Sequence, residues 1–341
     1  MAKHKRDWRA GGTRRPSDVL RTELLNMTRG YTLSQAVLTA NEIGLFNALA
    51  KGPLPIRGLA RRLQCSLRGV RALADALTVL GLLDRTGEQV RIVEAARDLL
   101  VRGGEAYIGH LLQHQKHLYD RWARLAEAVR TGKPVGRASR RGASRERFLR
   151  AMIEGSRPSV SEVVTQLDLS GCGSLLDLGG GMGAYAVAFA RRWPHLRVTL
   201  FDLPDVVTWA QCYFREEGME SRIGRIAGDA RRDRLGGPYD AIFISNVLHI
   251  FSSREITSVL RRARRALNPG GIVAVKDFAL RPDRRGPLRA GVFSLNMLVA
   301  SEQGGVYTDD EYEEMMNRAG LEKTAQNEMR EASVLLVARA R

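Results

Sequence analysis

The alternation of strand-like and helix-like segments after Ser174 constrains the fold of this chain more than any other sequence feature. Short apolar runs predict strands, and the amphipathic segments between them predict helices. Such an alternation indicates an α/β fold, a parallel sheet with helices on both faces. The predicted strands are 174–178, 197–201, 223–227, 241–245, 272–276, 321–327 and 333–338, and the predicted helices are 184–192, 206–217, 253–267 and 309–319.

Residues 17–103 follow a different pattern, in which apolar side chains recur at spacings of three and four. This spacing is typical of helices, and Ser66 is placed to cap one of them. Three helices followed by a small hairpin indicate a winged-helix-like domain. The predicted elements are a helix at 40–50 that ends before Gly52-Pro53, helices at 56–63 and 67–80, and hairpin strands at 83–86 and 89–93.

The winged-helix pattern has two interpretations. In the first, the helix at 67–80 recognises DNA and presents Arg68 and Arg71 to it. In the second, the domain serves dimerisation or docking. Most other positions of that helix are apolar, which indicates burial and favours the second interpretation, a fold-level analogy.

Residues 104–165 are predicted to form a helical connector that contributes to a substrate pocket. His110, His114 and His117 share one helical face, a spacing that also occurs in metal sites. The glutamate of an HExxH motif is absent and no nearby Cys or Asp completes a ligand set, so we expect no metal and instead a polar stripe along a pocket. Residues 131–145 are predicted to be an exposed loop, and 148–165 a helix.

The net charge of +17 is concentrated in a few segments, mainly residues 1–16, 130–150, 261–265 and 281–289. We expect 1–16 to be a disordered basic tail. Basic clusters bind nucleic acids by releasing counterions, but no aromatic residues interleave these, so a solvated surface is favoured and nucleic acid is not expected as a partner.

The cysteines and the apolar runs bear on location. Three scattered cysteines without a CxxC pair favour a reducing compartment. No apolar run reaches the ~18 residues of a membrane span, and the N-terminus lacks the apolar segment of a signal peptide. The sequence therefore predicts a cytoplasmic protein with no membrane span.

A glycine-rich segment, Asp177-Leu178-Gly179-Gly180-Gly181-Met182-Gly183-Ala184, joins the first predicted strand of the α/β region to its helix. Glycines permit a tight turn and the close approach of a ligand, and ligands of open parallel sheets bind at the carboxyl ends of the strands. The segment also satisfies the dinucleotide fingerprint, so it predicts either NAD or an adenosyl cofactor. Asp202, which ends the next strand, suits the ribose hydroxyls of both, and Asp229 after the third strand is placed to bind an adenine amino group.

These elements in this order resemble the class I small-molecule O-methyltransferases of the caffeate and acetylserotonin type, including their bacterial relatives. The resemblance extends over residues 17–341 and rests on LLDLGGGMGAYA (175–186), FDLPDVV (201–207), AGD (227–229), YDAIFISNVLH (239–249) and LNPGG (267–271). It implies a Rossmann-like core with a seven-stranded, mostly parallel sheet over 166–341. It also implies an N-terminal domain at 17–103 that forms a homodimer.

The resemblance implies that S-adenosylmethionine (SAM) is the cofactor and S-adenosylhomocysteine (SAH) its product. By the matching motifs, the residues implied to bind the cofactor are Asp177, Gly179, Gly181, Asp202, Leu203, Gly228, Asp229, Ala230 and Ser245. The small-molecule acceptor is expected against Trp122, Phe148, Met152, Phe293, Asn296 and Met297, a set of side chains that is equally compatible with a core.

His249 occupies the family's general-base position, and Asp277 matches an acidic residue that orients the histidine. A neutral imidazole can take a proton from a hydroxyl near pH 7. The chain departs from the family pattern, because His249 is followed by Ile250-Phe251 rather than Asp-Trp, and Ser245 replaces a lysine. A structural role for His249, with catalysis by proximity alone, is the alternative.

The expected reaction is methyl transfer to a hydroxyl of a small aromatic, polyketide-like or isoprenoid-like metabolite. Transfer to nitrogen or carbon on the same fold is an alternative acceptor chemistry. Two other functions remain open: a winged-helix regulator whose methyltransferase-like domain senses a ligand, and an NAD-linked oxidoreductase.

Overall fold

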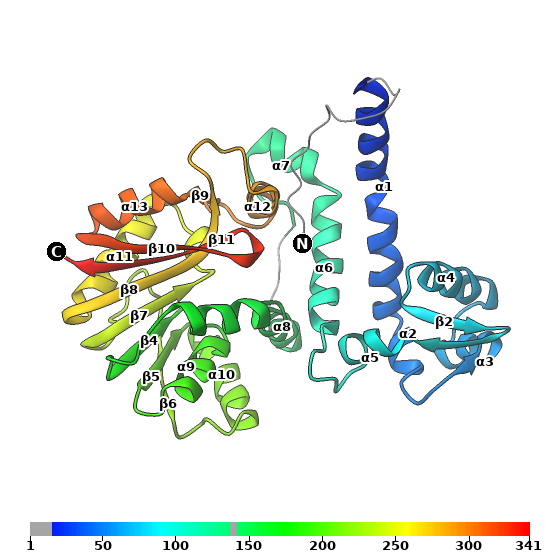
Figure 1. The fold of residues 1–341 in the computed structure, drawn as a ribbon, viewed down its shortest axis with the longest axis horizontal. Coiled ribbons are helices and arrows are strands. Elements are labelled where there is room, and N and C mark those ends of the chain that lie inside the picture. Colours follow the sequence, from blue (N-terminus) through cyan, green and yellow to red (C-terminus); the bar gives the residue numbers. More distant parts are fainter. Residues whose placement is uncertain (1–15, 137–141) are drawn as a thin grey trace. The chain divides into compact units, whose positions relative to one another are not determined.

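The computed structural model describes residues 16–136 and 142–341, which form two compact units, and the chain passes from one unit to the other between Lys116 and His117. The predicted basic tail lies outside the described residues apart from Pro16, as does part of the predicted 131–145 loop. Figure 1 shows the elements of both units.

The N-terminal unit packs helices against a small antiparallel sheet with strand order β1-β3-β2. Its core includes Leu45, Phe46, Ile56, Val70 and Leu77. The Ser66 hydroxyl accepts a hydrogen bond from the Gly69 N–H at 3.1 Å and thus caps α4, as its sequence position predicts. The elements are α1 (Pro16–Glu42), α2 (Leu45–Ala48), β1 (Leu54–Pro55), α3 (Ile56–Leu63), α4 (Leu67–Val79), β2 (Leu83–Thr86), β3 (Gln89–Ile92) and α5 (Glu94–Leu100).

The helix predicted at 40–50 is wrong in its bounds. Residues up to Glu42 belong to α1, and α2 begins only at Leu45. Gly44 separates the two, because its φ of +75° lies in the left-handed region and cannot continue a right-handed helix.

The second unit contains a central sheet with strand order β10-β11-β8-β7-β4-β5-β6. β8, β7, β4, β5 and β6 are parallel, and β10 and β11 are antiparallel, so the seven-stranded, mostly parallel prediction is confirmed. β9 (Tyr307–Thr308) pairs with the end of β8. The other strands are β4 (Ser174–Leu178), β5 (Arg197–Asp202), β6 (Ile223–Ala227), β7 (Tyr239–Ser245), β8 (Leu267–Leu280), β10 (Leu321–Met329) and β11 (Ser333–Ala340).

Helices cover both faces of this sheet (Figure 1). α11 and α13 pack on one apolar cluster, and α8, α9 and α10 contribute to the other, as alternating strand side chains require. α6 (Gly109–Trp122) runs across the boundary between the units. The remaining helices are α7 (Leu125–Thr131), α8 (Ala143–Gln166), α9 (Ala184–Arg192), α10 (Pro204–Glu216), η1 (Leu248–Ile250), α11 (Ser253–Arg265), α12 (Leu288–Ala300), α13 (Asp309–Arg318) and η2 (Arg330–Ala332).

β8 differs from its prediction, because it begins at Leu267 and includes the Asn-Pro-Gly-Gly segment expected as a turn. Leu267 pairs with Tyr239 and Ile272 pairs with Ala241, so three extra residues of β8 are accommodated in a bulge there. Because β6, β5, β4, β7 and β8 are parallel, their carboxyl ends lie at one edge of the sheet, where an open α/β sheet binds its ligands.

Candidate active site

The glycine-rich loop between β4 and α9 is held in a conformation that requires glycine. Gly179 and Gly183 have φ values of +73° and +89°, and a Cβ on them would lie 2.6 Å from Val247 Cγ2 and 2.5 Å from Phe214 Cε1. Gly181 has φ +61°, but a Cβ there would meet no protein atom within 4 Å. The loop is therefore packed against the protein on two sides and open at Gly181.

Asp177 supports this loop from behind. Its side chain is fully buried, and Oδ2 accepts a hydrogen bond from the Ala186 N–H at 3.1 Å. Oδ1 has no hydrogen-bond partner among the residues that the structure describes. Burial raises the pKa of Asp177 to about 7. Contact between this side chain and a ligand stays a prediction.

Asp202 lies at the end of β5, beside the open part of the loop. Its Oδ2 accepts the Gly181 N–H at 2.8 Å, and its Oδ1 accepts the N–H of the exposed Leu203 at 2.7 Å. Each carboxylate oxygen retains a further lone pair for a ligand donor. Burial raises the pKa of Asp202 to about 6, and the two backbone hydrogen bonds oppose that shift.

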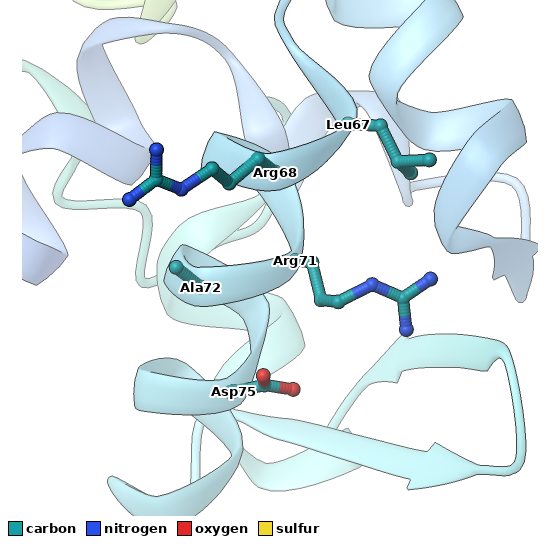
Figure 2. A pocket seen from close by; sticks show the side chains of 5 residues that line it. All are labelled: Leu67, Arg68, Arg71, Ala72 and Asp75. Atoms are coloured by element: carbon teal, nitrogen blue, oxygen red, sulfur yellow. The ribbon is translucent and has the colours of Figure 1, made fainter.

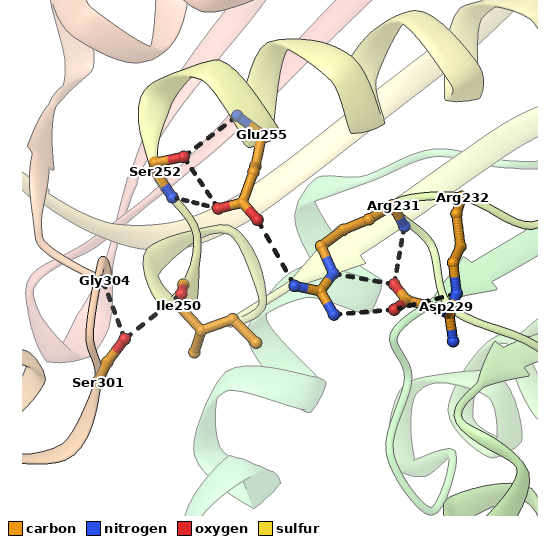
Figure 3. A network of polar contacts seen from close by, with 8 residues as sticks. All are labelled: Asp229, Arg231, Arg232, Ile250, Ser252, Glu255, Ser301 and Gly304. Carbon is orange, nitrogen blue, oxygen red and sulfur yellow. Dashed lines mark hydrogen bonds and ion pairs between the residues drawn. The ribbon is translucent and has the colours of Figure 1, made fainter.

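Asp229, after β6, is clamped by an arginine (Figure 3). Arg231 donates from Nε to Oδ1 at 3.1 Å and from Nη2 to Oδ2 at 2.8 Å, and its hydrogen bonds hold the pKa of Asp229 below the usual range. A Cβ on the preceding Gly228 would lie 2.7 Å from Phe201 Cζ, so the chain must pass close to β5 there. Ala230 follows and is partly exposed.

The same arginine reaches the segment that follows β7. Arg231 Nη1 lies 3.5 Å from Glu255 Oε1, and its guanidinium carbon lies 5.7 Å from the centre of the Phe251 ring. Glu255 forms a capping box with Ser252 at the start of α11, as Figure 3 shows. Arg231 therefore connects the loop after β6 to the loop after β7.

The turn after α12 also packs on this segment. The Gly305 N–H donates to the His249 carbonyl oxygen at 2.9 Å. Figure 3 shows the Ser301 hydroxyl, which accepts from the Gly304 N–H at 2.9 Å and donates to the Ile250 carbonyl oxygen at 3.5 Å. This turn thus holds the backbone carbonyls of both His249 and Ile250.

His249 and Asp277 form a buried pair. His249 Nδ1 lies 2.7 Å from Asp277 Oδ1, and the His249 N–H donates to Asp277 Oδ2 at 3.2 Å. The Phe278 N–H also donates to Asp277 Oδ1, at 2.8 Å. An ionised Asp277 accepts a proton from Nδ1, so the lone pair of the neutral imidazole lies on Nε2. Such an imidazole can take a proton from a bound acceptor.

Aromatic rings surround this pair. Phe293 of α12 meets His249 edge to face at a centroid distance of 4.9 Å, and Phe278 stacks on Phe293 at 4.0 Å. Stacked and edge-to-face rings of this kind form a surface suited to a flat apolar molecule.

The predicted substrate residues fall into separate groups. Trp122 Nε1 donates to Asn296 Oδ1 at 3.3 Å, and Met297 is buried on the same helix as Phe293. Phe148 instead packs with Met182 and Val206 in another cluster, while Met152 of α8 is 38% exposed. The structure thus joins Phe293 to His249 and Trp122 to Asn296.

Sequence reasoning missed three residues of this region: Arg231, Asn246 and Lys276. Lys276 ends the strand predicted at 272–276, and a lysine after four apolar residues was the available signal. Ser245, which was named, ends β7 and pairs in register with Lys276.

A hollow of about 610 Å³ lies on the N-terminal unit beside α4 and is lined by Leu67, Arg68, Arg71, Ala72 and Asp75. Figure 2 shows Arg68 and Arg71 pointing in opposite directions. Arg71 forms two hydrogen bonds of 2.9 Å with Glu88, and Arg85 pairs with Asp75. These ion pairs neutralise the positive charge of Arg71 and Arg85, which binding to DNA phosphates would require. The arrangement therefore favours a role of this domain in dimerisation or docking over DNA binding.

Two expectations concern metals and membranes. Among residues 16–136 and 142–341, no group of three His, Cys, Asp or Glu side chains is arranged to hold a metal ion. None of the helices described is long and apolar enough to cross a membrane. The three cysteines are free thiols.

Comparisons with known proteins match both units. Residues 122–322 match the model of the O-methyltransferase domain, and residues 25–102 match that of the O-methyltransferase dimerisation domain. The 3-hydroxy-5-methyl-1-naphthoate 3-O-methyltransferase of Streptomyces sahachiroi is 33% identical over 307 residues, which cover 88% of this chain and 89% of that protein. The acetylserotonin O-methyltransferase of Mus musculus is 33% identical and covers 94% and 86%.

Solved structures agree in fold. Human N-acetylserotonin methyltransferase in complex with SAM has a TM-score of 0.86 at 29% identity, with 97% of this chain and 99% of that chain covered. The structure of PigF with SAH has a TM-score of 0.86 at 25% identity, with 93% of this chain and 99% of that chain covered.

A relative with a different named activity was also found by sequence comparison. The N,N-dimethyltransferase OxyT of Streptomyces rimosus is 32% identical over 271 residues, which cover 76% of this chain and 78% of that protein.

Proposed function

The chain belongs to the O-methyltransferase family and is a SAM-dependent O-methyltransferase, and we propose that it methylates an aromatic hydroxyl with His249 as the general base. The observation that supports this proposal most is the buried His249–Asp277 pair beside the rings of Phe278 and Phe293.

The residues at the strand ends fit an adenosyl cofactor. The open side of Gly181 leaves room for a ligand against the loop, and Asp202 beside it has free lone pairs for ribose hydroxyls. When bound, SAM supplies a methyl group on a sulfonium sulfur, which is a good leaving group. The remaining work of the protein is to position the acceptor oxygen and to remove its proton.

In the proposed mechanism, Nε2 of His249 accepts the proton of the acceptor hydroxyl. The oxygen gains nucleophilicity as the O–H bond breaks, and the proton stays on the imidazole. Asp277 fixes the tautomer through Nδ1 and stabilises the imidazolium that forms. The aromatic rings exclude water and hold the acceptor ring.

An acceptor panel tests this function. Purified protein is incubated with SAM and hydroxynaphthoates, with N-acetylserotonin, and with matched compounds in which an amino group replaces the hydroxyl. Mass spectrometry is expected to find one added methyl on a phenolic oxygen. Transfer to the amines alone would instead favour nitrogen methylation, which one relative's name describes.

Arg231 is expected to contribute to cofactor binding through Asp229. We expect Arg231→Met to weaken SAH binding about three- to tenfold, because a charged hydrogen-bond partner of the proposed adenine contact is lost. Arg232→Met is the matched control, since that side chain is 79% exposed and lies 3.8 Å from Asp229. Isothermal titration calorimetry measures both, and equal effects would contradict the assignment to Arg231.

A homodimer through the N-terminal unit is supported by the dimerisation-domain match and by exposed apolar side chains on α1. Leu20, Leu24, Met27 and Tyr31 are each more than half exposed, and their spacing places them on one helical face. A contiguous apolar stripe of this kind indicates a protein contact. We propose that a second copy of the chain covers it.

The stripe can be tested by adding charge to it. The double variant Leu24→Glu, Met27→Glu is expected to weaken the dimer about a hundredfold or more, because two desolvated carboxylates would replace apolar contacts. Light scattering after size-exclusion chromatography reports the mass. Asn26→Glu, on another face of α1, should leave the dimer intact, and a double variant that stays dimeric would exclude this face.

A further inference from the structure

Lys276 is a buried cation that the proposed mechanism does not use. Its side chain is 2% exposed, it lies in β8 opposite Ser245, the last residue of β7, and burial lowers its pKa to about 8. Among the described residues, its side-chain hydrogen bond is to Asn246 Oδ1, at 3.2 Å, and it forms no ion pair within 4 Å. A buried ammonium without a counter-ion is unfavourable, so such a group indicates a function.

Two carboxylates, Asp277 and Glu162, lie close enough to Lys276 to raise its pKa, but both form hydrogen bonds with other groups. Asp277 holds His249, and both oxygens of Glu162 accept the Arg330 N–H at 3.1 Å. Arg289, a further cation, opposes the charge of Lys276. Among the described residues, Lys276 therefore has no carboxylate within hydrogen-bond distance.

Asn246 is the residue that can connect the positive charge of Lys276 to a bound ligand, because the two side chains are hydrogen-bonded. It follows β7 with a left-handed φ of +54°, and it is partly exposed where Lys276 is not. An ammonium only donates hydrogen bonds, so Lys276 must face the amide oxygen of Asn246. The Asn246 Nδ2 donors therefore point away from Lys276, and are available to an acceptor.

The strand order indicates which acceptor this is. Along the sheet edge, the proposed adenine contact Asp229 follows β6, the proposed ribose contact Asp202 ends β5, and the glycine-rich loop follows β4. The next positions in the same direction are Asn246 after β7 and Lys276 on β8. SAM has the same linear order of adenine, ribose, sulfur and methionyl chain, and its carboxylate ends that chain.

We propose that Asn246, oriented by the buried ammonium of Lys276, binds the methionyl carboxylate of the cofactor. Asn246 is the contact residue, and Lys276 is a positioning residue that also supplies the positive charge beneath it. The inference rests on the proposed placement of ribose and adenine at Asp202 and Asp229.

The test compares two ligands by calorimetry, which needs no turnover. SAH has the methionyl-type carboxylate, whereas 5′-methylthioadenosine has the adenosine and thioether without it. For Lys276→Met we expect SAH to bind about tenfold to a hundredfold more weakly. Binding of 5′-methylthioadenosine is expected to stay within twofold. Lys133→Met, at an exposed position of the same unit, is the matched control.

Asn246→Asp provides an independent variant that should fold, because the new carboxylate would pair with Lys276. It is expected to weaken SAH at least as much as Lys276→Met, by repulsion, and to spare 5′-methylthioadenosine. Equal losses for both ligands, or unchanged SAH affinity in either variant, would overturn the proposal. A wrong ribose placement has a different signature, since Asp202→Ala would then leave 5′-methylthioadenosine binding unchanged.

Discussion

Replacing His249 by alanine is expected to lower kcat by about 10²- to 10⁴-fold, the usual contribution of a positioned general base. The affinity for SAH should stay within about threefold, because the proposal assigns the imidazole to the acceptor and not to the cofactor. The pair with Asp277 is buried and well aligned at 2.7 Å, so removing the ring also removes the only proton acceptor that we assign. Single-turnover kinetics measure the chemical step directly.

Asp277→Asn separates the role of the histidine from that of its partner. The amide keeps the size of the side chain but loses the charge that stabilises the imidazolium, so we expect kcat to fall by less than in His249→Ala. The double variant should be no slower than His249→Ala, because the two residues act as a unit. If His249→Ala turns over at the wild-type rate, catalysis is by proximity alone and the base assignment is wrong.

Asp202→Ala is expected to weaken SAH binding by about tenfold to a hundredfold. A carboxylate that accepts two ribose hydroxyls contributes charged hydrogen bonds of about 1.5–3 kcal/mol in total effect, and each 1.4 kcal/mol is a factor of ten. Asp202→Asn retains one acceptor and should lie between wild type and alanine. Calorimetry with 5′-methylthioadenosine should show the same losses, since that ligand has the ribose as well.

The pH dependence follows from the same carboxyl group. Its pKa is raised to about 6 by burial, so lowering the pH through 6 protonates it and removes an acceptor. SAH affinity in the wild type should therefore fall between pH 7 and pH 5 more steeply than in Asp202→Asn. The folding stability of the ligand-free protein depends on pH in the opposite direction. Because the folded state binds the Asp202 proton more tightly than the unfolded state does, this group stabilises the fold at low pH, and that stabilisation is lost as the pH rises from about 4 to 6. Identical pH profiles in the two proteins would contradict the assignment.

Much of the fold followed from local patterns. The strand at 174–178 was predicted with the bounds that β4 has, and the helix at 184–192 with those of α9, because an apolar run and an amphipathic period are local properties. The bounds of β8 were not predictable, since the Pro-Gly-Gly segment looks like a turn and becomes a bulge only when β7 pairs with it. Gly44 likewise breaks a helix that its flanking sequence favours.

The candidate site divides in the same way. The sequence by itself determined the glycine-rich loop, Asp202, Asp229 and His249, because each follows a predicted strand and parallel strands end at one edge. The family resemblance implied that Asp277 orients His249, 28 residues away, and the structure places the two side chains 2.7 Å apart. Only the tertiary structure decided that Arg231 links Asp229 to Glu255 and that Lys276 is buried against Asn246. Periodicity reports which face of an element is buried, whereas the partner of a polar side chain depends on which strands become neighbours and on how their ends are aligned.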